Sequence, residues 1–541
     1  MCLINRTSID TDKNNICYIV DSILSEDFSI WDQHPGFYKG SMGWVNLIEF
    51  QDLDNLYREW DSFISLLPKY TDIVFVGFGG SILGGKLLNS FMSSQSDITT
   101  WYVDTVNPEE LETVKSSINL SSTLFMIASK SGNTLETRCL ERFFYEFRHS
   151  SISHLSDGKN FFAITDQGSD LEHLANMMRY EKVVYGARNV GGRFSALTPV
   201  GLFPAYLMGA RLTSFDLIFG GLSKKDNRNA RLYDEIISLI QFIAKSLESG
   251  RDKLTIEVPS GSPSLDALAL WIEQLISESL GKDGNGIILI TKEPQMNDED
   301  YSSDRAFIFI ETGREQIVDG RQRILDLARA NFPVMHMYID EVENNIVSEI
   351  FKWQIAVAAL GHLLKINPFD QPEVERSKML TRTLLSGATA GINRSKESGL
   401  SISQLLDACR FGNYIGILAY LPRISGVEMI LAQIRRELTR ITGVPTTLGY
   451  APSYLHSTGQ LHKGGPRNGV FIQITYDLDG DFKIPGEDFT FGDISMAQSE
   501  GDFIAMMEQN IPITKYHLGK DKINGLKILL ESLEQRNFSF S

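Results

Sequence analysis

Asp72-Ile-Val-Phe-Val-Gly-Phe-Gly-Gly-Ser81 is the stretch that determines the fold, because it joins an apolar run to a glycine-rich loop. A helical pattern follows at 82–92, and further apolar runs, separated by helical patterns, occur at 124–128, 161–165 and 182–185. Continuous apolar strands that alternate with helices are typical of a parallel sheet with both faces covered. This part of the chain is therefore predicted to form an α/β sandwich.

The same alternation restarts further along the chain. The expected strands are 253–258, 286–290, 305–310 and 334–339, and the expected helices are 264–280, 321–330 and 342–365. We predict an α/β fold with two doubly wound, mostly parallel-sheet sandwiches and α/β extensions at both ends. The expected domains are 1–45 (N-terminal extension), 46–222 (first sandwich), 223–390 (second sandwich) and 391–541 (C-terminal region with a histidine loop and a closing helix). The boundary between the sandwiches is expected near 220–227, where glycine and polar residues separate two helical stretches.

The composition excludes several classes of protein. The chain has 541 residues, with 51 Lys and Arg against 68 Asp and Glu, which gives a net charge of −17. A surface this acidic repels nucleic acid and anionic membranes, so neither is expected as a partner. The four scattered cysteines form no disulfide framework and no zinc motif, and the N-terminus lacks the apolar stretch of a signal peptide. We therefore expect a cytoplasmic protein without a membrane span.

The loop after the first strand carries Gly80 and Ser81, which are candidates for binding a phosphate. Glycines between a strand and a helix let backbone amides approach an anion at the helix N-terminus. The loop also resembles a nucleotide-binding P-loop, but Leu87 occupies the position of the magnesium-binding Ser or Thr. Ile82 stands where a dinucleotide-binding loop needs its third glycine. A tight turn without a ligand is the alternative interpretation.

The next apolar run is followed by Ser129-Lys-Ser-Gly-Asn-Thr-Leu-Glu-Thr137. Hydroxyl groups, a lysine and an expected helix start are groups that can bind a phosphate. Ser129, Lys130, Ser131 and Thr134 are therefore substrate-binding candidates, with Thr134 as an ordinary helix cap as the alternative. In a parallel sheet this loop and the Gly80 loop lie at the same edge, where ligands bind.

Two successive sandwiches, with this loop in the first of them, resemble the sugar isomerase (SIS) domain pair. Three further segments are similar to the glucose-6-phosphate isomerase family. They are Val190-Gly-Gly-Arg-Phe-Ser195, Gln274-Leu-Ile-Ser-Glu-Ser-Leu-Gly-Lys282 and Asn367-Pro-Phe-Asp-Gln-Pro-Glu-Val-Glu-Arg-Ser-Lys378. The segments occur in the family's order, and the resemblance covers roughly residues 70–385.

The resemblance implies a reaction that moves a proton between C1 and C2 of a sugar phosphate through an enediolate. Glu278 is then the base that carries the proton, and Gln274, one helical turn earlier on the same face, is a substrate contact. The apolar neighbours of Glu278 predict partial burial, and a solvated helix carboxylate is the alternative. Arg193, with Gly192, is implied to stabilise the enediolate, and an arginine in a loop salt bridge is the alternative.

The last of these segments contributes Gln371 and Lys378. By resemblance they contact sugar hydroxyls and transfer a proton at the ring oxygen during ring opening. A surface lysine is the default interpretation of Lys378 taken alone.

The catalytic histidine is where this chain departs from the family. The family often carries it in a His-Ser-x-Gly-Gln string between the base and the glutamine–lysine segment, where the histidine here is His336, in an expected strand or core position. The string occurs later, as Leu455-His-Ser-Thr-Gly-Gln-Leu-His-Lys-Gly-Gly465, in an order that resembles the isomerase portion of transaldolase–glucose-6-phosphate isomerase fusions.

By this resemblance His456 assists ring opening and Glu136 orients it. His462 is the second candidate, and Lys463 could contact the substrate. The family's histidine often reaches across a subunit interface, so a homodimer is implied.

The implied function is the interconversion of D-glucose 6-phosphate and D-fructose 6-phosphate in glycolysis and gluconeogenesis, without a metal or another cofactor. One alternative is an isomerase of mannose phosphate or an amino sugar phosphate. The other is a sugar-phosphate sensor without turnover. A sensor needs the phosphate loops but not Glu278, Arg193 and Lys378 together, so their joint presence favours an enzyme.

Overall fold

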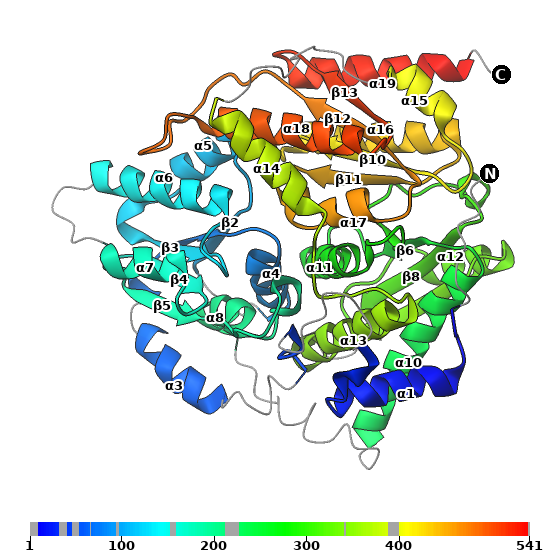
Figure 1. The fold of residues 1–541 in the computed structure, drawn as a ribbon, viewed down its shortest axis with the longest axis horizontal. Coiled ribbons are helices and arrows are strands. Elements are labelled where there is room, and N and C mark those ends of the chain that lie inside the picture. The colour runs from blue at the N-terminus through cyan, green and yellow to red at the C-terminus, as the bar shows by residue number, and fades with distance from the viewer. Residues whose placement is uncertain are drawn as a thin grey trace.

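The computed structural model describes residues 9–31, 41–45, 53–64, 67–92, 97–151, 158–210, 227–339, 342–387 and 400–538. Within these ranges, three β-sheets have helices packed around them (Figure 1). The strands pair in parallel throughout each sheet. The predicted α/β class with parallel sheets is confirmed.

The first sheet has the strand order β2-β1-β3-β4-β5. Its strands are β1 (Asp72–Val76), β2 (Thr99–Val103), β3 (Thr123–Ala128), β4 (Phe161–Thr165) and β5 (Lys182–Tyr185). The helices of this part are α3 (Leu53–Ile64), α4 (Gly80–Met92), α5 (Pro108–Ser117), α6 (Leu135–Ser151), α7 (Asp170–Met177) and α8 (Pro199–Leu207), with short helices η3 (Leu67–Lys69), η4 (Leu120–Ser122) and η5 (Gly192–Phe194). Every residue of β1, β3 and β4 is buried, as expected for strands covered on both faces. Because β1 and β3 are neighbours, the loops that follow them lie side by side.

The second sheet has the order β7-β6-β8-β9. Its strands are β6 (Lys253–Glu257), β7 (Ile288–Thr291), β8 (Arg305–Thr312) and β9 (Val334–Ile339), and its helices are α10 (Asn227–Glu248), α11 (Pro263–Leu280), α12 (Gly320–Arg329) and α13 (Val342–Leu363), with η6 (Asp298–Asp300). The N-terminal helix α1 (Lys13–Leu24) packs on α10 and α13, and η1 (Phe28–Trp31) follows it. His336 lies in a strand as predicted, but it is exposed and its Nε2 is 2.8 Å from Glu311 Oε2, so it is not a core residue.

The C-terminal region contains a third sheet with the order β11-β10-β12-β13. Its strands are β10 (Tyr414–Ala419), β11 (Thr446–Tyr450), β12 (Gly469–Thr475) and β13 (Ile513–His517). The helices are α14 (Val374–Leu385), α15 (Ile402–Ala408), α16 (Ser425–Thr442), η7 (Ser453–His456), α17 (Gly459–Gly464), α18 (Phe491–Glu508) and α19 (Lys522–Phe538). The sequence predicted an α/β extension here but not a complete sheet. Helix α14 follows the part of the chain that forms the second sheet. It packs on α18 and so connects that part to the third sheet (Figure 1).

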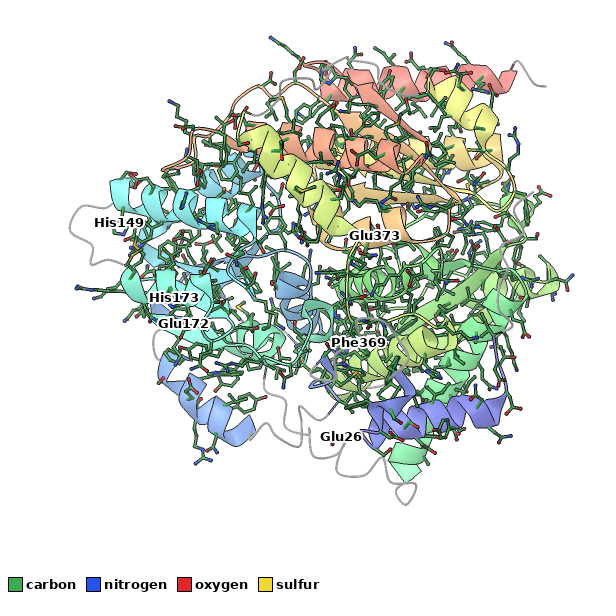
Figure 2. All side chains as sticks on the ribbon, viewed as in Figure 1. Glu26, His149, Glu172, His173, Phe369 and Glu373 are labelled. Atoms are coloured by element: carbon green, nitrogen blue, oxygen red, sulfur yellow. The ribbon has the colours of Figure 1, made fainter. Side chains whose placement is uncertain are left out.

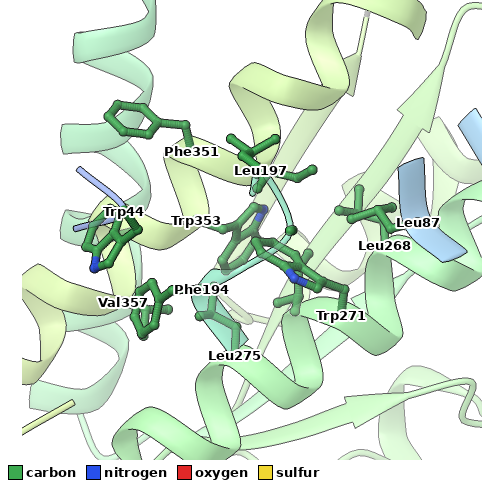
Figure 3. Close-up of a cluster of buried hydrophobic side chains, with 14 of the residues drawn as sticks. Trp44, Leu87, Phe194, Leu197, Leu268, Trp271, Leu275, Phe351, Trp353 and Val357 are labelled. Carbon is green, nitrogen blue, oxygen red and sulfur yellow. The ribbon is translucent and has the colours of Figure 1, made fainter. Parts of the chain in front are cut away.

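The largest hydrophobic core lies where α4, α11 and α13 meet (Figure 3). Trp271 of α11 and Trp353 of α13 are fully buried in it. Phe194 of η5 packs into the same core, and its carbonyl oxygen accepts a hydrogen bond of 2.9 Å from the buried Gln354. Close packing of this kind fixes the orientation of both η5 and α11. These two elements carry Arg193 and Glu278.

The domain boundaries predicted at residues 45, 222 and 390 adjoin or fall within ranges that the structure does not describe, as does the boundary region 220–227. The division into domains therefore stays a prediction. In the described ranges, no helix combines the length and the apolar character needed to cross a bilayer.

Candidate active site

A cavity of about 610 Å³ lies between the first sheet, helix α11 and the segment around η7. Twelve of the fourteen site residues predicted from the sequence line it. They are Gly80, Ser81, Lys130, Ser131, Thr134, Gly192, Arg193, Gln274, Glu278, Gln371, Lys378 and His456. The two that do not line it are Ser129 and Glu136.

The glycines after β1 let three chain segments approach one another closely. Gly79 has a φ of +54°, and a Cβ atom there would lie 2.5 Å from the carbonyl oxygen of His456. A Cβ atom on Gly80 would lie 2.1 Å from the carbonyl carbon of Gly192. From the sequence alone, the only function predicted for these glycines is to let the loop bind a phosphate. The structure adds that any side chain would push the histidine segment and the Arg193 segment away from the cavity.

The loop after β3 contributes hydroxyl groups and a lysine to the cavity. Lys130 Nζ donates to the carbonyl oxygen of Val190 at 2.5 Å and lies 3.6 Å from Asp166 Oδ2. Ser129, predicted to contact substrate, is instead buried, and its Oγ accepts from the Gly132 N–H at 3.2 Å. Its hydroxyl also lies 3.3 Å from Thr134 Oγ1. Ser129 therefore shapes the loop from within, because its hydroxyl is used by the loop's own groups.

Glu278 is held at the cavity by partners on both of its carboxylate oxygens. It lies on α11, which begins at a capping serine, Ser262, with Pro263 in its first turn. Gln274 Nε2 donates to Glu278 Oε2 at 3.0 Å and also to the His456 carbonyl oxygen at 3.2 Å. Arg193 Nη1 lies 3.4 Å from Glu278 Oε1. Glu278 is 8% exposed, so the expected partial burial is present.

Arg193 is buried and bonded to the segment that precedes α14. Its Nη2 donates to the carbonyl oxygens of Pro368 at 2.9 Å and Asp370 at 2.8 Å, and its Nη1 lies 3.4 Å from Gln371 Oε1. Burial lowers the pKa of Arg193, while Glu278 and Asp370 act in the opposite direction. An arginine still keeps its charge near neutral pH, so the cavity contains a fixed cation.

Lys282 is a residue of this site that the sequence interpretation left without a role. Its buried Nζ donates to the carbonyl oxygen of Asn367 at 2.6 Å and to Asp370 Oδ1 at 2.7 Å. Burial, and then the positive charge of Arg193, lower the pKa of Lys282 to about 7. Lys282 and Arg193 together anchor residues 367–371, the segment that carries Gln371 into the cavity.

His456 contacts Glu136 although the helices that carry them, η7 and α6, lie beside different sheets. Its Nε2 lies 2.9 Å from Glu136 Oε1, and Gln498 Nε2 of α18 donates to the same oxygen at 2.6 Å. Burial disfavours the charged form of Glu136, but the charge of His456 and these hydrogen bonds outweigh it, so the pKa of Glu136 is lowered. Gln498 is a further residue that the sequence did not single out. Neither its residue type nor its spacing marks it as part of a site.

His462 lies away from the cavity, in the core of the third sheet. Its ring packs against Tyr454 and Phe471, with centroids 6.0 and 4.9 Å away. Burial, and then the charge of Lys463, lower the pKa of His462 to about 3, so the ring is neutral. Lys463 is buried and pairs with Asp502 at 2.5 Å. Of the two histidine candidates, the structure brings only His456 into the site.

Lys378 projects from α14 into the cavity with its side chain 39% exposed. Its Nζ donates to Glu375 Oε1 at 2.8 Å, an exposed pair that a ligand can replace at little cost. A smaller cavity of about 360 Å³ adjoins the first and shares Lys378 and His456 with it.

His149 and His173 lie on the outer helices α6 and α7, far from Glu373 at the centre of the molecule (Figure 2). Within the described ranges, no three His, Cys, Asp or Glu side chains are grouped as metal ligands.

Comparison with known proteins finds similarity to phosphoglucose isomerases, which are also named glucose-6-phosphate isomerases. A family model described as phosphoglucose isomerase matches residues 60–294. The glucose-6-phosphate isomerase of Methanocaldococcus jannaschii is 25% identical over 379 residues, which are 64% of this chain and 90% of that protein. An enzyme of the same name from Thermus thermophilus is 29% identical, over 64% of this chain and 91% of its own.

Two solved structures share the fold. A hypothetical protein from Thermus thermophilus superposes with a TM-score of 0.56 at 24% identity, covering 69% of this chain and 96% of its own. A glucose-6-phosphate isomerase from Chlamydia trachomatis superposes with a TM-score of 0.50 at 19% identity, covering 70% of this chain and 86% of its own. The matching family model and the named relatives show that the chain is similar to phosphoglucose isomerases, and the solved structures show that it shares their fold.

Proposed function

We propose that this chain interconverts D-glucose 6-phosphate and D-fructose 6-phosphate. The observation that carries the proposal is the single cavity in which a carboxylate, a buried arginine, a histidine and a lysine face two hydroxyl-bearing loops. A sensor of sugar phosphates would need the loops but not the four reactive side chains. The names of the curated relatives support the same reaction.

The phosphate of the substrate binds between the loops that follow β1 and β3. Ser81, Ser131 and Thr134 offer hydroxyl donors, and Lys130 offers a positive charge at the same wall of the cavity. The N-terminus of α6 begins at Leu135, directly after this loop, and favours an anion.

Ring opening is assigned to His456 with Lys378. Because the pKa of Glu136 is lowered, its carboxylate is ionised at neutral pH and accepts a hydrogen bond from His456 Nε2–H. The other ring nitrogen, Nδ1, is then left free to exchange a proton with the substrate hydroxyl. Lys378 Nζ can donate at the ring oxygen.

Proton transfer between C1 and C2 is assigned to Glu278. Gln274 holds one of its oxygens and Arg193 lies beside the other, so the carboxylate is oriented before the substrate arrives. Glu278 removes the proton from one carbon and returns it to the next. Arg193, which is itself buried, faces the negative charge that develops on the enediolate oxygens and stabilises it.

We also propose a role in glycolysis and gluconeogenesis, a cytoplasmic location and a homodimer. The domain division predicted from the sequence is part of the same proposal. His456 reaches the cavity from the same chain as Glu278, so the chemistry assigned here does not depend on the homodimer.

The test is a coupled assay. Purified protein receives fructose 6-phosphate in the presence of EDTA, and glucose 6-phosphate is followed through an NADP-dependent dehydrogenase. We expect rapid product formation in the parent protein and a loss of about 10²–10⁴-fold in kcat for Glu278→Gln, which removes the base and little of the binding. A parent protein without turnover, or a Glu278→Gln variant with the parent's kcat, would overturn the proposal.

A further inference from the structure

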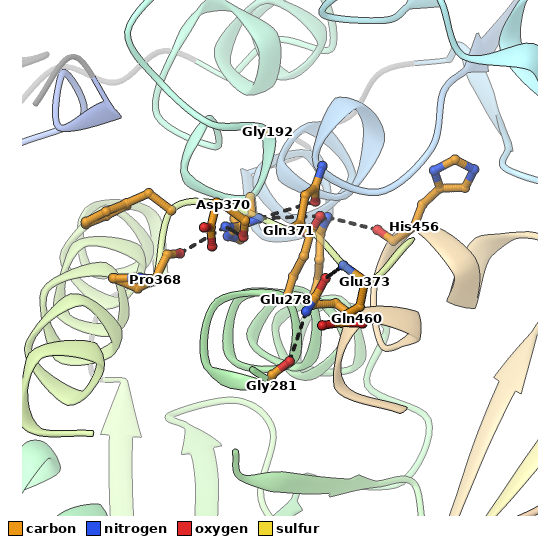
Figure 4. A network of polar contacts seen from close by, with 12 residues as sticks. Gly192, Glu278, Gly281, Pro368, Asp370, Gln371, Glu373, His456 and Gln460 are labelled. Carbon is orange, nitrogen blue, oxygen red and sulfur yellow. Dashed lines mark hydrogen bonds and ion pairs between the residues drawn. The ribbon is translucent and has the colours of Figure 1, made fainter. Parts of the chain in front are cut away.

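Gln460 lies at the point where three segments of the proposed site meet (Figure 4). Its Nε2 donates to the carbonyl oxygen of Gly281, the residue that ends α11, at 3.0 Å. Its Oε1 accepts from the backbone N–H of Glu373, directly before α14, at 3.0 Å. Gln460 itself belongs to α17, and its side chain is fully buried. One amide group therefore joins the ends of three separate helices.

The junction around Gln460 is packed at backbone distance. A Cβ atom on Gly281 would lie 2.4 Å from the Cα of Leu461, and one on Gly464 would lie 2.6 Å from the Gly281 carbonyl oxygen. The Gly284 N–H also donates to the Gly464 carbonyl oxygen at 3.0 Å. Interfaces this tight transmit a displacement of one helix to the next, because they contain no free volume to absorb it.

Each of the three segments carries one reactive side chain. Glu278 precedes Gly281 in the last turn of α11, His456 precedes Gln460 at the end of η7, and Lys378 follows Glu373 in α14. Gln460 does not line the cavity, so it has no direct contact with a substrate there. We infer that Gln460 is a positioning residue that sets the distances among Glu278, His456 and Lys378. This inference rests on the function proposed above.

Glutamine suits this position because it offers a donor and an acceptor at the same place. The carbonyl oxygen of Gly281 requires an N–H, and the N–H of Glu373 requires an oxygen. A methionine fills the same volume with neither group. A glutamate keeps the acceptor for Glu373 but loses the donor for Gly281. Gln460→Met therefore removes both hydrogen bonds, whereas Gln460→Glu removes only the one to Gly281.

Steady-state kinetics with fructose 6-phosphate test the inference. We expect Gln460→Met to lower kcat about 10- to 100-fold, because displacements near 1 Å have effects of this size, while KM changes by less than about threefold. Gln460→Glu should fall between the parent and Gln460→Met. The matched control is Gln473→Met in β12, since Gln473 is also fully buried and exchanges two 3.0 Å hydrogen bonds with Ser499. Its kcat should stay within about twofold of the parent.

A second readout separates positioning from loss of folded protein. In the Glu278→Gln background, Gln460→Met should reduce the residual turnover much less than it does in the parent, because the base it positions is already absent. A loss of folded protein would reduce both backgrounds by the same factor. If Gln460→Met fails to fold, Gln460→Glu supplies the same comparison.

The inference is overturned if both Gln460 variants keep the parent's kcat, or if Gln473→Met lowers kcat as much as Gln460→Met. It is also overturned if Gln460→Met lowers turnover by the same factor in the parent and in the Glu278→Gln background. A parent protein that turns over no fructose 6-phosphate would instead refute the proposed function, so the two failures are distinguishable.

Discussion

His456 Nε2 lies 2.9 Å from Glu136 Oε1, although 320 positions of the chain separate the two residues. Glu136 is in the first turn of α6, beside the first sheet, and His456 ends η7, beside the third sheet. Gln498 of α18 donates to the same carboxylate oxygen. Helices beside the third sheet thus contribute two of the three groups in this hydrogen-bonded set, and they do so within one chain.

This contact leads to a prediction about ring opening. We expect His456→Asn to slow turnover of ring-closed substrate about 10²–10⁴-fold and that of open-chain substrate much less, because only ring opening uses its proton. His462→Asn should leave the ratio of the two rates unchanged, since His462 is buried away from the cavity. Rapid-mixing kinetics on the two substrate forms measure this ratio. Equal slowing of both forms by His456→Asn would contradict the assigned role.

Arg193→Lys should impair turnover more than binding. The guanidinium makes hydrogen bonds to the Pro368 and Asp370 carbonyl oxygens and still lies beside Glu278, an arrangement that a lysine cannot reproduce. We expect kcat to fall about 10²–10³-fold, with a smaller change in the dissociation constant of fructose 6-phosphate.

The control for Arg193→Lys is Arg376→Lys, a change of the same kind at an exposed position. Arg376 is a residue of α14 that pairs with Glu508 at 2.6 Å, and we expect its kcat to match the parent's. Equal losses of kcat and of binding affinity in Arg193→Lys would indicate an arginine with a purely structural role.

His462 predicts how stability depends on pH. Its pKa is about 3 in the folded protein against 6.5 for an ordinary histidine, so below pH 6.5 the unfolded chain binds a proton that the folded chain does not. The free energy of unfolding therefore falls as the pH falls through this window, by about 2 kcal/mol between pH 7 and pH 5 from this residue. His462→Phe keeps an aromatic ring between Tyr454 and Phe471 but removes the titration.

Urea denaturation of the parent and of His462→Phe at pH 7 and pH 5 checks this prediction. Every other titrating group is common to the two proteins, so the difference between their pH dependences reports His462. The parent should lose about 2 kcal/mol more than the variant. Identical losses would mean that the histidine is protonated within the fold.

Much of the fold was predictable because strands and helices leave a local pattern. β1, β3 and β4 are continuous buried runs, and α11 follows a clear capping signal. β10 is an equally buried run, at Tyr414–Ala419, and its pattern would have been sufficient to predict it. β11 has a buried residue only at its start, so its sequence carries a weaker signal.

The sequence alone was sufficient to predict the α/β class, the two candidate phosphate-binding loops and the motifs that contain Glu278, Arg193 and Lys378, because each depends on residues close together in the chain. The three-dimensional structure was needed to show that His456 rather than His462 reaches the cavity and that Ser129 turns inward. It also showed that Lys282, Gln460 and Gln498 surround the site. These are contacts between distant segments, set by how the sheets pack and by which buried polar groups must find partners. Neither requirement leaves a mark in the local spacing of residues.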